Sequence, residues 1–275
     1  MADKHFKSLD AWAEHKPPDS GCLLRCDGSY SPGKAHSYRW NGAERARGES
    51  RVPYSDYYEI YAAAPMYRGE RRLSSLDRQN LLQSPIQTDS SGSAALGVPF
   101  ADAEHPFPHN AHHIVPRGVL HQGIDGVAGQ AEPNVTDMYN LVVGGLLTEP
   151  YNLNAQPNVI ILPTQRPAAE RLGLPRHLDD AEARSHPIYS SMVSAQVVPL
   201  FNQSYSGLAA EVAARAHDGP DPTMPAMRGA IEAISNAIYE AIIVLAAALR
   251  AKDAALDAVP SLDEISGELF LIARG

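Results

Sequence analysis

The sequence predicts an α+β protein with a long C-terminal helix and an irregular, loop-rich N-terminal lobe. Between Met224 and Ala258 apolar residues recur every three or four positions, which is the period of an amphipathic helix. The β-branched run NVIILP at 158–163 is bounded by Asn and Pro and predicts a short strand. Residues 1–83 are rich in Arg, Tyr, Gly and Pro and have few periodic stretches. Helix, strand and loop patterns therefore all occur in one chain.

We expect three regions along the chain. Residues 1–104 are expected to form the irregular lobe with a linker. The stretch 84–108, which spans this boundary, is rich in Ser, Gly, Ala and Pro, as linkers are. Residues 105–202 are expected to form a core domain, because they hold extended pieces and most of the histidines. Residues 203–275 are expected to pack helically against that core.

Bulk properties exclude some classes of protein. The chain has 275 residues and a net charge of −9, which argues against non-specific wrapping of nucleic acid. Its longest apolar run, Ala241 to Leu249, is far shorter than the roughly 20 residues of a membrane span. The polar N-terminus has no signal-peptide pattern. We therefore expect no membrane partner, and a cytoplasmic protein or one exported without a cleaved signal. The pair Cys22 and Cys26 is interpreted as ordinary thiols.

Tyrosines lie among arginines in the N-terminal lobe. Seven of the twelve tyrosines lie between Tyr30 and Tyr67, among several arginines. Such a mixture can stack on bases and pair with phosphates. It is equally typical of a loop-rich lobe whose tyrosines pack on the core, and this second interpretation is the favoured one.

Two helices are predicted after residue 186. Pro187 suits a first helical turn, and Ile188, Met192, Val193 and Val197 follow at helical spacing. The apolar stripe of the long tail helix consists of Ile231, Ile234, Ile238, Ile242, Leu245 and Leu249. This stripe is expected to pack on the protein's own core, and a homodimer seam is the alternative.

Five of the eleven histidines lie between His105 and His121. The adjacent pair His112 and His113 precedes Ile114 and Val115 in an extended stretch. Neighbouring side chains of a strand point to opposite faces, so the two rings take different directions unless a twist brings them into one cleft. Further along, Asn158 begins the predicted strand, and His177 and His186 precede the predicted helix.

Three strings in order resemble a known group of nucleases. AHHIVP (111–116), NVIILP (158–163) and SHPIY (185–189) look like the AHH group of the HNH/endonuclease VII superfamily, the ββα-metal nucleases. The match covers about 80 residues. The resemblance implies a β-hairpin and a helix that hold one divalent ion. It implies that His112 and His186 are metal ligands, that His113 is the general base, and that Asn158 orients this base.

This sequence departs from the group's pattern at two places. The group often has a further histidine four residues before the last one, whereas His177 precedes His186 by nine residues. His177 is thus either a third ligand or no ligand. The interval from His113 to Asn158 is also longer than usual, which places extra residues within 121–152.

The resemblance implies a metal-dependent endonuclease that hydrolyses phosphodiester bonds in DNA or RNA. The ion is Zn, Mg, Mn or Ni, because imidazole ligands favour transition metals and Mg remains compatible with a shell of water and phosphate. The group is often found in bacterial toxins, so an immunity-type inhibitor is expected as a partner if the protein is one. Two alternatives stay open: an HNH-like metalloenzyme acting on a small molecule or peptide, and a non-catalytic, metal-stabilised interaction protein.

Overall fold

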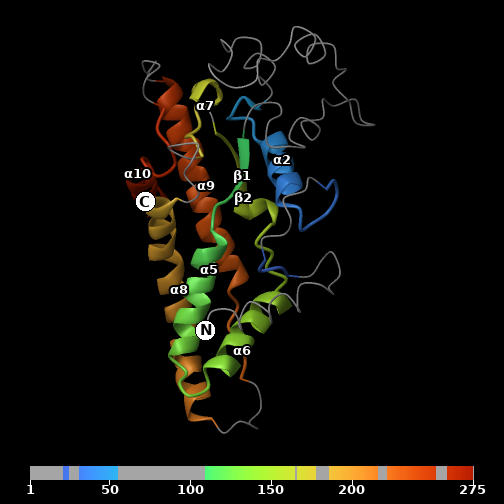
Figure 1. Ribbon diagram of the computed structural model, residues 1–275, viewed down its shortest axis with the longest axis vertical. Helices are drawn as coiled ribbons and strands as arrows, with labels where there is room; N and C mark the ends of the chain where they lie inside the picture. Colours follow the sequence, from blue (N-terminus) through green and yellow to red (C-terminus); the bar gives the residue numbers. More distant parts are fainter. Residues whose placement is uncertain are drawn as a thin grey trace.

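The computed structural model is a mostly helical α+β fold with a small two-stranded antiparallel sheet (Figure 1), which confirms the predicted fold class in its coarse form. It describes residues 21–24, 31–54, 109–164, 166–177, 186–215, 222–251 and 259–274. The predicted linker at 84–108 and Cys26 lie outside these ranges. The elements in chain order are α2 (Tyr38–Gly48), β1 (His109–His113), α5 (Arg117–Gly129), α6 (Val135–Thr148), the 3-10 helix η2 (Gln156–Asn158), β2 (Val159–Pro163), α7 (Arg166–Leu172), α8 (Pro187–Ala214), α9 (Arg228–Ala251) and α10 (Ser266–Arg274).

The sheet consists of β1 and β2, which pair antiparallel from His109 opposite Pro163 to His113 opposite Val159. The predicted strand at 158–163 is confirmed, except that Asn158 ends η2 and the strand begins one residue later. Every residue of β2 is buried, as expected for a continuous apolar run covered on both faces. The sheet therefore lies inside the fold and carries the histidine pair into it.

Two helices connect the strands where the resemblance implies a hairpin. α5 and α6 contain most of residues 121–152, and neither helix was predicted from the sequence. Glycines lower the helix propensity of both segments, so packing has to stabilise them. α5 lies along α8 (Figure 1), and a Cβ added to Gly123 would come within 2.7 Å of the Phe201 ring. Glycine at this position allows the two helices to approach closely.

The two long helices follow the predicted patterns, and α9 has a shifted start. The predicted end of the tail helix, at 252–258, lies outside the described residues. α8 begins at Pro187 as predicted. α9 begins at Arg228 instead of Met224, because the Glu149 carboxylate accepts hydrogen bonds from the backbone N–H groups of Met227 and Arg228. Within α9 the stripe residues Ile231, Ile238 and Ile242 are fully buried in the chain's own core.

The hydrophobic core is continuous across the expected region boundaries. It extends from Leu23 and Tyr54 in the N-terminal lobe to Leu269 in α10. α8 runs through the expected boundary between 202 and 203. α2, which was not predicted, packs on β2, and its Tyr38 is buried. For Tyr38 and Tyr54 the structure thus supports packing on the core over exposure to bases.

One helical segment of the described chain, Arg228–Ala248 within α9, is long and apolar enough to cross a membrane by length and composition alone. Half of its most apolar stretch is buried inside the fold. A buried core helix of a soluble protein has the same properties, so this segment is weak evidence for a membrane span.

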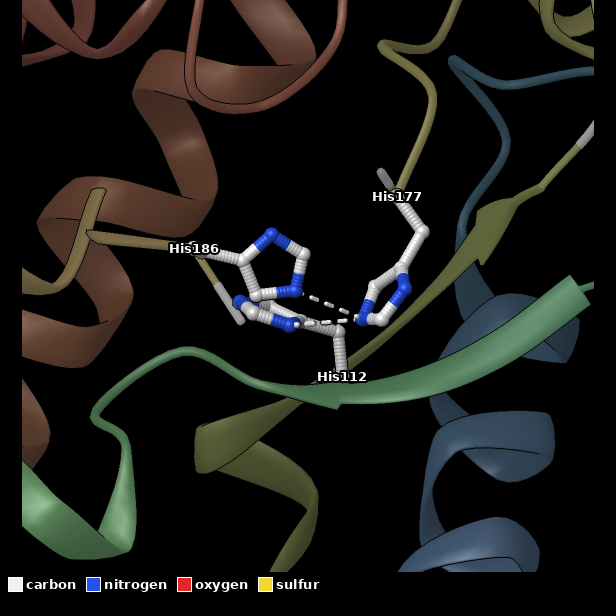
Figure 2. Close-up of side chains that lie close together, drawn as sticks. All are labelled: His112, His177 and His186. Atoms are coloured by element: carbon white, nitrogen blue, oxygen red, sulfur yellow. Dashed lines mark hydrogen bonds between the residues drawn. The ribbon is translucent and has the colours of Figure 1, made fainter. Parts of the chain in front are cut away.

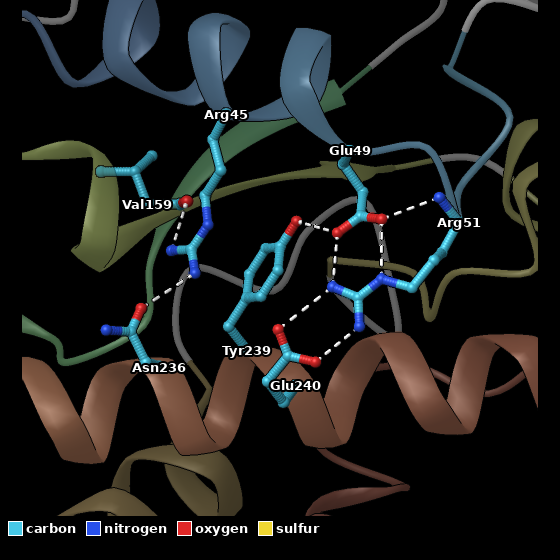
Figure 3. A network of polar contacts seen from close by, with 7 residues as sticks. All are labelled: Arg45, Glu49, Arg51, Val159, Asn236, Tyr239 and Glu240. Atoms are coloured by element: carbon cyan, nitrogen blue, oxygen red, sulfur yellow. Dashed lines mark hydrogen bonds and ion pairs between the residues drawn. The ribbon is translucent and has the colours of Figure 1, made fainter.

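A polar network joins α2, β2 and α9 on the side of the sheet that α2 covers (Figure 3). The Arg45 guanidinium lies 3.3 Å from the centre of the Tyr239 ring and donates hydrogen bonds to the carbonyls of Gln156 and Pro157. Arg51 binds the carboxylates of Glu49 and Glu240 at once, and Tyr239 donates to Glu49 over 2.9 Å. These contacts fix α9 against the chain segments that enter β2.

The pKa of Glu49 gives this network a pH dependence. The hydrogen bonds from Arg51 hold this pKa at about 2, below its ordinary value of 4.5. A lowered pKa stabilises the fold above the ordinary value, and this stability is lost as the pH falls from about 4.5 to about 2. We expect Glu49→Gln to be less stable at neutral pH and to show a smaller loss of unfolding free energy over this interval. Urea unfolding at a series of pH values measures the free energy of unfolding of both proteins.

The matched control is Glu44→Gln, which removes a half-buried glutamate of α2 that pairs with Arg47. We expect this control to retain the wild-type pH dependence. If Glu49→Gln and Glu44→Gln show the same dependence below pH 4.5, the Glu49 network does not cause the acid sensitivity.

Candidate metal centre

His112 and His113 point to opposite faces of the small sheet. They are the last two residues of β1, and successive side chains of a strand alternate between its faces. The His112 ring lies 5.0 Å from the ring of Tyr189 on α8, between ring centres. The His113 ring lies 4.9 Å from the ring of Tyr38 on α2. The structure therefore separates the environments of the two adjacent histidines.

Backbone contacts bring His177 to the side of β1 that carries His112. The His177 N–H donates to the carbonyl of Pro163 at the end of β2, over 2.7 Å. Next to it, Arg176 forms a parallel bridge with Ser261 of the C-terminal segment. These bonds on both sides fix the chain at 176–177, so that the eight intervening residues do not prevent His177 from meeting His186.

His186 stands at the N-terminus of α8, directly before Pro187. Its side chain makes no capping hydrogen bond, so the ring is not used to start the helix. The Asp263 carboxylate accepts a hydrogen bond from the backbone N–H of Tyr189 over 2.8 Å and satisfies the first helical turn. Asp263 and Tyr189 thus hold the helix start that presents His186, and sequence reasoning did not single them out.

The rings of His112, His177 and His186 converge (Figure 2). Their candidate ligand atoms all lie within 4.8 Å of one another. His177 Nε2 is 3.2 Å from His112 Nδ1 and 3.0 Å from His186 Nε2. The nitrogen atoms around a tetrahedral ion with bonds of about 2.0–2.1 Å are about 3.3 Å apart, so small shifts would fit the triad to an ion such as Zn²⁺.

Asn110 supports the triad from the same face of β1. Its side-chain amide lies 3.2 Å from His177 Nδ1, the ring nitrogen that does not face the other two histidines. The Asn110 atom that faces Nδ1 is the amide nitrogen, which donates. An imidazole that binds a metal through Nε2 carries its proton on Nδ1 and donates it to an acceptor, so Asn110 would orient a metal-bound His177 through its amide oxygen, with the amide turned over. Asn110 stands two residues before His112, and this spacing in a strand is the sequence signal that would have indicated it.

His113 is 9% exposed and is held by Asn154. His113 Nε2 lies 3.1 Å from the Asn154 side-chain oxygen. The contact that the resemblance assigns to Asn158 is therefore made by Asn154, four residues earlier. Asn154 lies in the loop before η2, and no string of the sequence pattern contains it.

Asn158 acts on the backbone that follows His113. Its side-chain oxygen accepts from the N–H of Val115, and its side-chain nitrogen donates to the carbonyls of Val115 and Leu153. The Ser235 hydroxyl lies 3.0 Å from the same oxygen. The nitrogen and the oxygen of this buried amide thus both have backbone partners, so Asn158 fixes the turn after β1 and does not bond to the His113 ring.

Replacing Asn158 should therefore destabilise the fold. We expect Asn158→Leu to lower the free energy of unfolding by about 3 kcal/mol or more, because several buried backbone groups lose their partners. Asn236→Ala removes an exposed asparagine that bonds to Arg45, and its effect should stay below about 1 kcal/mol. Urea unfolding of both variants measures the difference. Equal losses of unfolding free energy would show that the hydrogen bonds between Asn158 and Val115 do not stabilise the fold.

Comparison with known proteins adds nothing to this geometry. No protein-family model, no curated protein and no solved structure matches the chain. The chemistry of the site is therefore argued from its own residues.

Proposed function

We propose that the protein is a metal-dependent endonuclease that hydrolyses phosphodiester bonds of DNA or RNA, with one divalent ion at the His112/His177/His186 triad. The observation that carries the proposal is the convergence of three imidazoles from three separate segments of the chain. These segments are a strand, the stretch after α7 and a helix start. One of the three rings is buried and two are half-buried, and the polar ring nitrogens in such surroundings need hydrogen-bond partners or a metal ion.

The order of elements also supports this proposal. An antiparallel strand pair followed by a helix is what the ββα-metal resemblance implies. Here β1 carries one histidine and the start of α8 carries another. α5 and α6 stand where that pattern has a hairpin turn, and α7 lies between β2 and α8. In this proposal the arrangement is an elaborated form of that pattern.

Three neutral imidazoles suit an anionic substrate. They leave the double positive charge of the ion undiminished, and they favour Zn, Mn or Ni over Ca. When bound, the ion would neutralise charge on the phosphoryl oxygens and assist the departure of the leaving oxygen. His177 and His186 are only half-buried, so the triad has a side that a polymer can approach.

In this proposal His113 is the general base. Its ring takes a proton from the attacking water, whose oxygen forms a bond to phosphorus while the bond from phosphorus to the sugar oxygen breaks. His113 is the last residue of β1, and Asn158 fixes the turn that follows it. Asn158 thus orients the strand end, whereas Asn154 holds the His113 ring.

One observation favours a second candidate, a non-catalytic protein that the ion stabilises. His113 is 9% exposed, packs against Tyr38 and faces away from the triad. In that case the ion only fastens β1, the 176–177 stretch and α8 together. An enzyme that acts on a small molecule or peptide is the third alternative.

Cleavage assays distinguish these candidates. Plasmid DNA and a folded RNA are incubated with wild-type protein loaded with Zn, Mn, Ni or Mg, and with a chelator. We expect cleavage of at least one polymer by wild type and by His121→Gln, which changes a buried histidine of α5 outside the triad. His186→Ala should be inactive. If metal-loaded wild type cleaves neither polymer, the endonuclease proposal is overturned.

A further inference from the structure

We propose that Asn154 is a positioning residue that keeps the proton of neutral His113 on Nε2, so that Nδ1 is the nitrogen able to accept a proton. The inference deepens the proposed function and rests on it for its catalytic meaning. It concerns a residue that lies outside the three strings of the sequence pattern. Its evidence is a set of hydrogen bonds around one fully buried amide.

The orientation of the Asn154 amide is set on the side away from His113. Its side-chain nitrogen donates to the backbone carbonyl of Leu24 over 2.8 Å and lies 3.6 Å from the sulfur of Cys22. A carbonyl oxygen only accepts hydrogen bonds, so the amide nitrogen has to face Leu24. The amide oxygen consequently faces His113.

This orientation determines where His113 carries its proton. The Asn154 oxygen is 3.1 Å from His113 Nε2 and can only accept. Nε2 must therefore carry the hydrogen, and a neutral imidazole has only one N–H. Nδ1 is left with a lone pair, which is the requirement for a group that removes a proton from water.

The N-terminal lobe supplies the support for this contact. The backbone of Cys22 bonds to the carbonyl of Tyr151 and to the N–H of Leu153, and so places the 22–24 segment beside the loop that holds Asn154. Asn41 of α2 donates to the Asn154 carbonyl over 2.7 Å. Segments more than a hundred residues before Asn154 thus fix the amide on which His113 depends.

The direct test is the tautomer of His113 in the full-length, Zn-loaded protein, read from the ¹⁵N shifts of its ring in mildly alkaline buffer. His113→Asn assigns the signals by their loss. We expect the Nε2–H form in wild type. An Nδ1–H form, or an even mixture of the two, would overturn the proposal. This measurement does not depend on cleavage. It therefore decides the tautomer of His113 even if the protein cleaves no nucleic acid.

Variants separate positioning from support of the fold. Asn154→Leu removes the acceptor and should populate both tautomers, while Zn affinity stays within a few-fold of wild type and kcat falls by roughly 10–100-fold with little change in KM. Asn154→Asp keeps an acceptor and should retain the Nε2–H form.

The matched control is Asn152→Ala, whose parent side chain accepts from the Asn154 backbone N–H. It should keep both the tautomer and kcat. If Asn152→Ala loses kcat as Asn154→Leu does, the role of Asn154 is only structural.

Discussion

Replacement of His177 by alanine is expected to weaken binding of the divalent ion by more than the roughly 10–100-fold that loss of an outer-shell partner costs. His177 Nε2 is the atom nearest to both other candidate ligands, at 3.2 and 3.0 Å. Its backbone bond to Pro163 does not involve the ring, so the variant should keep its fold. Titration with Zn or Mn, followed by calorimetry, measures the affinity.

Comparison within the triad makes this test more specific. His186→Ala should lower the affinity for the ion equally. Its side chain has no part in capping α8, so the variant should keep its fold. Asn110→Ala removes only the amide beside His177 Nδ1 and should lower the affinity for the ion by about 10–100-fold. His121→Gln should leave the affinity at the wild-type value. A His177→Ala variant that binds as tightly as His121→Gln would remove His177 from the site.

His113→Ala is expected to retain the ion and to lose about 10²–10⁴-fold in the rate of cleavage, the usual effect of removing a positioned acid–base group. The reason is that the two adjacent rings point in opposite directions. The His112 ring points to His177 and His186, whereas the His113 ring points to Tyr38 and Asn154. Metal titration and single-turnover cleavage on His112→Ala and His113→Ala, side by side, provide the measurement.

Each outcome has a distinct meaning. His112→Ala should lose the ion, and with it the cleavage. If His113→Ala cleaves at the wild-type rate, the base is another group. If it loses the ion as His112→Ala does, both rings are ligands and the separation by the strand fails. Because His113 is buried, unfolding of the variant is measured in parallel, and Tyr38→Ala serves as a control for packing alone.

Local signals in the sequence predicted the elements that depend on local chemistry. The β-branched run gave the position of β2, and Pro187 gave the start of α8. Helices that depend on packing were missed. Four glycines dilute the pattern of α5, and this helix is stabilised by close contact with α8, which Gly123 permits. α2 forms against a sheet that lies more than sixty residues later in the chain.

The candidate site shows the same division. The ordered strings indicated His112 and His186 and left open whether His177 is a ligand. The structure brings the three rings together. They did not indicate Asn110 or Asn154, because asparagine is common in loops and strand ends and only the fold shows which amide meets which ring. The role of Asn158 also could not be read correctly. Its partners are backbone groups of Val115 and Leu153, which no residue pattern specifies.

The central claim, one ion held by three imidazoles, is tested most directly by the metal content and coordinating atoms of the purified protein. Mass spectrometry after loading with Zn counts the ions per chain, and X-ray absorption identifies the ligand atoms. The proposal predicts one ion with three imidazole nitrogens at about 2.0–2.1 Å. Failure to retain an ion would contradict the claim. So would a coordination shell that stays the same when His112, His177 and His186 are all replaced by alanine.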